Sequence, residues 1–135
     1  MGWTKMKVWT REEVFEGVRE VIVDAIGVAE EEIKEEATLT RDLGAESIDF
    51  LDIVFRLEKT FSIKIPRGEL FPDDILTSAQ YFDGGRMTTD GVYVLKAAMP
   101  HADLSDFEKD PDISEIPNLF TVKMIVNFVM AKLAV

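Results

Sequence analysis

The sequence predicts an all-α protein. Thr10, Ser47 and Thr121 are typical helix-capping residues, and the apolar residues that follow each of them recur at helical spacing. The length sets the number of domains, because 135 residues of which 47% are hydrophobic can bury one core but are few for two. We therefore expect a single domain over residues 1–135.

The first helix is expected over residues 10–26. Thr10 and Glu13 have the spacing of a capping box, and Gly27 is a typical stop signal. One face of this helix is apolar and consists of Val14, Val18, Val21, Ile22 and Ala25.

A long, ordered loop is expected over residues 28–46. Helical periodicity breaks there and acidic residues accumulate, while Ile33, Ala37 and Leu39 are placed to hold the segment to the core. Ordered loops of this length are often functional.

The second helix is expected from Ser47 to about Thr60, with Ser47 as the N-cap. Pro66 ends the short run that follows it. The predicted buried stripe consists of Ile48, Leu51, Val54, Phe55 and Leu57. The last helix begins after Thr121 and presents Ile125, Phe128, Val129 and Leu133 on one face.

Residues 67–118 lie between these two helices and give conflicting local signals. Gly84-Gly85 is a flexible pair, and Asp90-Gly91 is compatible with a hairpin turn. Thr88 or Thr89 can instead cap a helix that ends before Pro100, and we favour this helix. The acidic stretch 101–117 is expected to be a surface connection, in which a short helical turn can occur.

The net charge of −11, from 26 acidic and 15 basic residues, disfavours binding to nucleic acid or to anionic membranes. It favours partner proteins with basic patches, mainly by raising association rates. The sequence has no cysteine, so any thiol must come from another molecule. Neither a signal peptide in residues 1–10 nor a membrane span is indicated, and we expect a cytoplasmic protein.

The stretch Asp42–Asp52 carries the most informative pattern. Gly44 permits a tight turn, and Ser47 then opens a helix, where the positive end of the helix dipole favours a phosphodiester on the serine hydroxyl. Asp49 and Asp52 offer acidic contacts to a modifying enzyme. By itself this pattern is far more often that of an ordinary serine N-cap.

The sequence Asp-Leu-Gly-Ala-Glu-Ser-Ile-Asp-Phe-Leu-Asp at 42–52 resembles the prosthetic-group attachment motif of acyl carrier proteins. Segments 57–66 and 120–129 resemble the end of that family's second helix and the start of its last one, so the resemblance covers about 10–66 and 119–134. Glu46 and Ile48 stand where the family usually has Asp and Leu. About fifty residues, approximately 67–118, are inserted where ordinary carriers have a short segment.

The resemblance implies a four-helix acyl-carrier-like bundle without catalytic activity, with a helical insertion between the second and last main helices. It also implies 4′-phosphopantetheine bound covalently to Ser47. The implied partners are a phosphopantetheinyl transferase, ketosynthase, acyltransferase and other enzymes of lipid synthesis, which would dock at Glu46, Asp49 and Asp52. We expect the carrier to be a monomer.

Three segments resemble specialised carriers of very-long-chain hydroxy fatty acids destined for lipid A. They are Ile48–Phe55, Lys64–Pro66 and residues 87–96. An acyl chain in water exposes apolar surface whose burial is worth about 0.8 kcal/mol per methylene, so an apolar insertion would shield more of it. Residues of this kind are more often ordinary core residues, but the candidates for such an acyl cavity are Phe50, Leu51, Val54, Phe55, Phe71, Phe82, Tyr93 and Leu95.

Other classes of function fit the sequence less well than a carrier does. A hydrolase using Ser47 would need a base, but the single histidine, His101, lies in the acidic insertion, and the second glycine of a nucleophile elbow is missing. His101 alone is a poor metal site. An acidic interaction module remains an alternative, although the calcium-binding EF-hand pattern is absent. Peptidyl, D-alanyl and polyketide carriers remain alternatives within the resemblance.

Overall fold

The computed structural model of the protein describes residues 8–134. The predicted absence of a signal peptide therefore concerns residues that lie mostly outside the described range. Within this range the chain is mainly helical. The helices are α1 (Arg11–Ile26), α2 (Ser47–Phe61), α3 (Asp73–Leu76), α4 (Thr89–Ala98), α5 (Ser105–Lys109) and α6 (Val122–Leu133), with the 3₁₀ segments η1 (Glu30–Glu32), η2 (Ala79–Tyr81) and η3 (Ile113–Leu119) and the strands β1 (Phe82–Asp83) and β2 (Arg86–Met87).

Helix α1 begins at the predicted capping box. The Thr10 hydroxyl accepts a hydrogen bond from the Glu13 N–H at 3.1 Å, and the Thr10 N–H donates to Glu13 Oε1 at 3.0 Å. The helix ends at Gly27, whose φ of 84° lies in the left-handed region. Both predicted ends of the first helix are confirmed.

The starts of α4 and α6 are also capped by threonine. The Thr88 hydroxyl accepts from the Gly91 N–H at 3.0 Å, and the Thr121 hydroxyl accepts from the Met124 N–H at 3.1 Å. Helix α4 ends at Ala98, before Pro100, so the favoured helical interpretation is confirmed over the hairpin at Asp90-Gly91.

A small hairpin does occur, but earlier in the chain. Strands β1 and β2 pair antiparallel, with Phe82 opposite Met87 and Asp83 opposite Arg86. Gly84 and Gly85 join them with φ angles of 59° and 81°. Two positive φ angles in a row are what a tight two-residue hairpin turn needs, so the pair described as flexible from the sequence forms a defined turn.

The predicted buried stripe of α2 is wrong in part. The fully buried α2 residues are Ile53, Leu57 and Phe61, whereas Ile48, Leu51 and Phe55 are exposed. The apolar residues of this helix occupy more than one face, and helical spacing alone does not indicate which face meets the core.

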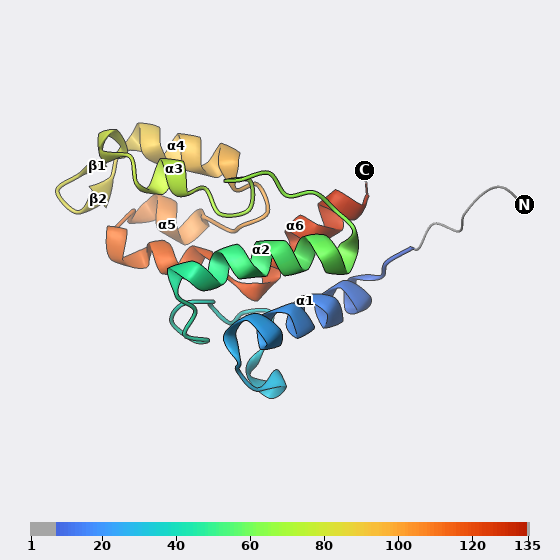
Figure 1. The fold of residues 1–135 in the computed structure, drawn as a ribbon. Helices are drawn as coiled ribbons and strands as arrows, with labels where there is room; N and C mark the ends of the chain where they lie inside the picture. Colours follow the sequence, from blue (N-terminus) through green and yellow to red (C-terminus); the bar gives the residue numbers. More distant parts are fainter. Residues whose placement is uncertain (1–7, 135) are drawn as a thin grey trace, which may run out of the picture.

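Helix α1 packs against both α2 and α6, and the insertion lies on the other side of α2, with α4 farthest from α1 (Figure 1). The buried side chains form one cluster, which includes Ile33, Ala37 and Leu39 of the long loop and Leu70, Leu95 and Phe107 of the insertion. The predicted all-α bundle with a helical insertion is confirmed. Residues 101–117 contain more helix than predicted, because α5 and most of η3 lie there.

Candidate functional site

Ser47 is the first residue of α2 and is exposed to solvent. The N-cap is Glu46, in an extended conformation with φ −105° and ψ 170°, so the prediction that Ser47 itself caps the helix is wrong by one residue. The Glu46 N–H donates to Asp49 Oδ2 at 2.7 Å, and the Asp49 N–H donates to the Glu46 carbonyl at 2.9 Å. The carboxylate of Asp49 thus closes the first turn, and the Ser47 hydroxyl is not used to cap it.

The loop before Ser47 is held by its own backbone. The N–H groups of Leu43 and Ala45 donate to the carbonyls of Thr38 and Leu39 at 3.1 and 2.8 Å, and both side chains are buried. Gly44 lies between them with a φ of 75°, which favours glycine, and no atom lies within 4 Å of the position that a Cβ would take. The turn therefore presents an open approach next to the serine.

The same loop is fixed to the start of α6. The Leu39 N–H donates to the Phe120 carbonyl at 2.9 Å, and the Val122 N–H donates to the Ala37 carbonyl at 3.0 Å. Arg41, which the sequence analysis did not single out, connects this loop to the insertion through its side chain. Its acceptors lie more than seventy residues later in the sequence, so no local pattern indicates the contact.

The three predicted docking residues have different surroundings. Glu46 is exposed, whereas the Asp49 carboxylate accepts the hydrogen bond that closes the first turn of α2. Asp52 pairs with Arg56 one turn later, Oδ1 to Nε at 3.1 Å. The acidic character of this helix start is therefore partly neutralised by its own arginine.

An apolar stripe lies beside these charges on the outer side of α2. Ile48 is 74% exposed, Leu51 58% and Phe55 54%, and their spacing places them on one face of the helix. A shallow groove that includes Phe55 and Ile63 continues this face toward the end of the helix. Large exposed apolar side chains in a row are typical of a surface that another protein covers.

Three aromatic rings meet next to the first turn of α2. Phe50 stacks on Phe71 of the insertion with ring centroids 4.7 Å apart, and Phe120 lies 6.2 Å from Phe50 and 5.7 Å from Phe71. This cluster joins α2, the start of the insertion and the residue before Thr121.

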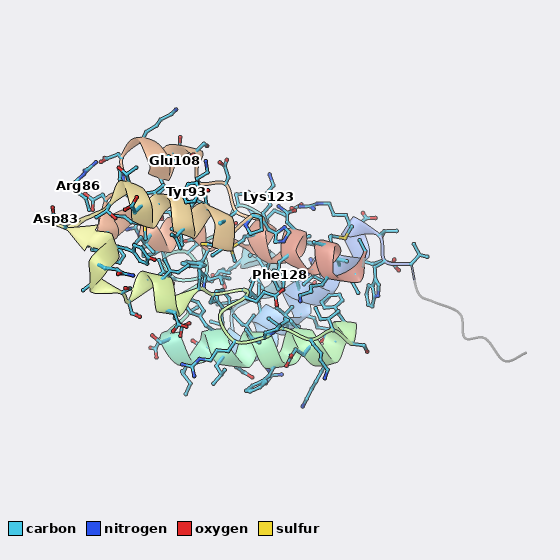
Figure 2. The ribbon with its side chains drawn as sticks, turned by 90° about the horizontal axis from the view of Figure 1, so that it is seen from above. Asp83, Arg86, Tyr93, Glu108, Lys123 and Phe128 are labelled. Atoms are coloured by element: carbon cyan, nitrogen blue, oxygen red, sulfur yellow. The ribbon has the colours of Figure 1, made fainter. Side chains whose placement is uncertain are left out.

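The structure brings two of the residues predicted to line an acyl cavity, Phe50 and Phe71, into a stacked pair, whereas the others lie in different surroundings. Phe50 and Val54 are half-buried, Leu95 is fully buried, and Leu51 and Phe55 lie on the exposed stripe. Tyr93 is 77% exposed and lies on the insertion near Glu108, away from α2 (Figure 2). Of the two further candidates, Phe71 belongs to the aromatic cluster and Phe82 to β1.

The acidic residues of the insertion are mostly engaged in local contacts. Asp103 and Asp112 each accept hydrogen bonds from the hydroxyl and the N–H of the serine two residues later, and these bonds lower the pKa of both carboxyl groups. His101 packs its ring edge against Phe128, with centroids 5.8 Å apart. Within residues 8–134, no group of histidine and carboxylate side chains is arranged to hold a metal ion, and no helix is long and apolar enough to span a membrane.

Comparisons with known proteins point to the same segment. Residues 16–74 match the family model described as a phosphopantetheine attachment site. The chain is 43% identical over 56 residues to an acyl carrier protein of Wolinella succinogenes, covering 42% of this chain and 74% of the relative. It is 41% identical over 61 residues to an acyl carrier protein of Thermotoga maritima, covering 45% and 75%. A third acyl carrier protein, from Campylobacter hominis, is 44% identical over 57 residues, covering 42% and 72%.

Proposed function

The chain belongs to the acyl carrier protein family, and on that premise we propose that it carries acyl groups on a phosphopantetheine arm attached to Ser47. Members of this family are carriers and not catalysts, and this chain holds 4′-phosphopantetheine covalently. The arm supplies the thiol that a protein without cysteine lacks, and acyl groups are linked to that thiol as thioesters.

The observation that supports Ser47 as the attachment residue is its place at the start of α2. Its hydroxyl is exposed, and Asp49 rather than Ser47 closes the helix start. A phosphodiester at this point faces the positive end of a helix of 15 residues. Ser62, the other serine within the matched segment, is at the opposite end of α2 with a φ of 53°, where the dipole disfavours an anion.

We further propose that partner enzymes dock on the outer side of α2. The exposed stripe of Ile48, Leu51 and Phe55 gives a partner apolar surface to cover, and Glu46 and Asp52 flank it with negative charge. A basic partner is attracted by this charge before contact, which raises the association rate. The partners proposed for this face are the phosphopantetheinyl transferase and the ketosynthases and acyltransferases of lipid synthesis.

The proposed cargo is a long acyl group. Most of the apolar residues in segment 68–99 pack against the core, among them the buried Leu70 and Leu95. The Phe50–Phe71 pair joins this segment to α2 three residues after Ser47, and we propose that an acyl chain leaving Ser47 enters there. Separation of these two rings would admit the acyl chain between α2 and the insertion.

Four expectations from the sequence stay predictions: the very-long-chain specialisation, the monomeric state, the single-domain organisation and the cytoplasmic location.

The test is the intact mass of the protein after expression with a phosphopantetheinyl transferase, followed by identification of any acyl group that co-purifies. We expect a mass increase of one phosphopantetheine group, and a long acyl chain on part of the sample. An aminoacyl or polyketide group would indicate one of the other carrier classes. A protein that stays unmodified would favour an acidic interaction module.

A further inference from the structure

Both ends of the insertion lie against the elements that surround Ser47. Near its beginning, Phe71 stacks on Phe50, which is three residues after Ser47. Near its end, residues 114–118 contact Arg41, which is six residues before Ser47. The insertion therefore contacts the carrier fold close to the proposed attachment site twice, once near its beginning and once near its end.

The Arg41 guanidinium contacts three acceptors on η3. Its Nη1 donates to Asn118 Oδ1 at 3.0 Å and to Glu115 Oε2 at 3.3 Å. Its Nη2 donates to the carbonyl oxygen of Ser114. The planar guanidinium presents several N–H donors in a fixed fork, which suits acceptors in fixed positions better than the flexible ammonium of a lysine does.

The acceptors are themselves held in place. Asn118 Nδ2 donates to Glu115 Oε2 at 3.1 Å, which fixes the two side chains relative to each other. Asp112 Oδ1 accepts from the Ser114 N–H at 2.9 Å and from its hydroxyl at 2.7 Å. These bonds hold the acceptors of Arg41 in fixed positions relative to one another.

On its other side, Arg41 belongs to the turn that leads to Ser47. Asp42 Oδ2 accepts from the Thr38 N–H at 2.8 Å, and the Gly44 N–H donates to the Thr40 carbonyl at 3.0 Å. Arg41 lies within the residues that both of these bonds enclose. A displacement of Arg41 would therefore move Gly44 and, through it, the start of α2.

We propose that Arg41 is a positioning residue that fixes the attachment loop against the insertion and thereby sets how Ser47 is presented to the phosphopantetheinyl transferase. This inference rests on the proposed attachment at Ser47. It makes the insertion part of the attachment site in this carrier, in addition to any part it has in enclosing the acyl chain.

The substitution Arg41→Ala separates positioning from charge, because the two effects have opposite signs. Loss of a positive charge makes the surface more acidic and would speed encounter with a basic transferase. Loss of positioning would slow the reaction. We expect kcat/KM for modification of the full chain to fall about fivefold, which corresponds to about 1 kcal/mol, the upper end for an exposed charged contact.

Three further measurements sharpen this test. Arg86→Ala is the matched control, because Arg86 pairs with Asp110 at 2.6 Å inside the insertion. This substitution removes the same charge without changing a contact of the attachment loop, so kcat/KM should not fall. Arg41→Lys keeps the charge but not the fork and should restore only part of the rate. Hydrogen exchange at the amides of Leu43 and Ala45 should be faster in Arg41→Ala than in Arg86→Ala.

A substitution in the insertion tests the same contact independently of Arg41. Asn118→Ala leaves Arg41 and the net charge unchanged, and it should slow modification in the same direction by a smaller factor. If Arg41→Ala and Asn118→Ala are both modified as fast as the unsubstituted protein, with unchanged exchange in the loop, the positioning role is overturned. Modification that persists in Ser47→Ala would instead overturn the attachment site, so the two failures are distinguishable.

Discussion

The carboxylate of Asp49 accepts a hydrogen bond from the backbone N–H of Glu46 at 2.7 Å, and Ser47 lies inside the turn that this bond closes. An acidic residue two positions after the serine has been interpreted from the sequence as a contact for partner enzymes. In the structure its first role is to hold the helix start on which Ser47 is presented.

The first prediction concerns this bond. Asp49→Ala should lower the free energy of unfolding by about 1 kcal/mol, the typical worth of a helix-start cap. Asp52→Ala is the control, because Asp52 makes an exposed ion pair with Arg56 one turn later, and its loss should cost only about 0.3–0.5 kcal/mol. Urea unfolding of both variants measures the difference, and equal losses would show that the Glu46–Asp49 bond stabilises the protein no more than an exposed ion pair does.

A second prediction tests how the insertion is attached to α2. Phe71→Ala should destabilise the protein by about 2–4 kcal/mol, because it removes a ring that stacks on Phe50 and touches Phe120. Tyr93→Ala removes an aromatic ring of the same insertion that is 77% exposed, and it should change stability by less than about 0.5 kcal/mol. Similar effects of the two substitutions in denaturant unfolding would contradict the arrangement described.

The exposed stripe on α2 gives a third prediction. Ile48→Ser and Phe55→Ser should leave stability nearly unchanged, since both side chains are mostly in solvent, but they should slow reaction of the carrier with a ketosynthase or transferase. The salt dependence of that rate should be retained in these variants and reduced in Asp52→Asn, because only exposed charge is screened by ions. Unchanged kinetics in the two serine variants would place the docking surface elsewhere.

A fourth prediction follows from the lowered pKa of Asp112. A carboxyl group whose pKa is lower in the folded than in the unfolded protein adds stability above its unfolded pKa, and this stability is lost as the pH falls through the folded value. Asp112→Asn should therefore be less stable than the unsubstituted protein near neutral pH. The difference should shrink as the pH falls below the ordinary pKa of an aspartate and vanish only below the lowered pKa of Asp112 in the folded protein. Urea unfolding at pH 7 and in strong acid tests this, and a difference that persists in acid would show that the charge of Asp112 is not the cause.

The fifth prediction concerns the proposed cargo. Progressively longer acyl groups on the arm should raise the melting temperature, because each methylene that the folded state buries adds up to about 0.8 kcal/mol of stability. The rise should continue to longer chains than in a variant whose residues 68–99 are replaced by a short Gly-Ser linker. If both proteins reach a plateau at the same chain length, the insertion does not enclose the acyl group.

The helix boundaries were predictable where a single side chain makes the cap. Thr10, Thr88 and Thr121 each accept a hydrogen bond from an amide three residues later, and that chemistry can be identified from residue type and spacing. At α2 the same reasoning was wrong by one residue. There the Asp49 side chain makes the closing bond, and the N-cap residue, Glu46, takes part through its backbone N–H. A cap that uses the backbone cannot be identified from the residue type.

The faces of α2 and the contacts of the insertion were not predictable in this way. Phe55 and Leu57 are both apolar at compatible spacing, yet one is 54% exposed and the other fully buried, because the core lies on one side only. The contact of Arg41 with Asn118 joins residues 77 positions apart, and only the folded chain brings them together. The motif at 42–52 predicts the attachment site from the sequence, whereas the contact between its loop and the insertion is visible only in the structure.

The most direct test of the central claim is the intact mass of two variants after reaction with phosphopantetheinyl transferase and coenzyme A. Ser47→Ala should show no mass increase while its helical circular dichroism is retained. Ser62→Gly, which alters the other serine in the matched segment at a φ of 53° that glycine tolerates, should gain one phosphopantetheine group as the unsubstituted protein does. A mass increase in a folded Ser47→Ala protein would contradict the assignment of the attachment site.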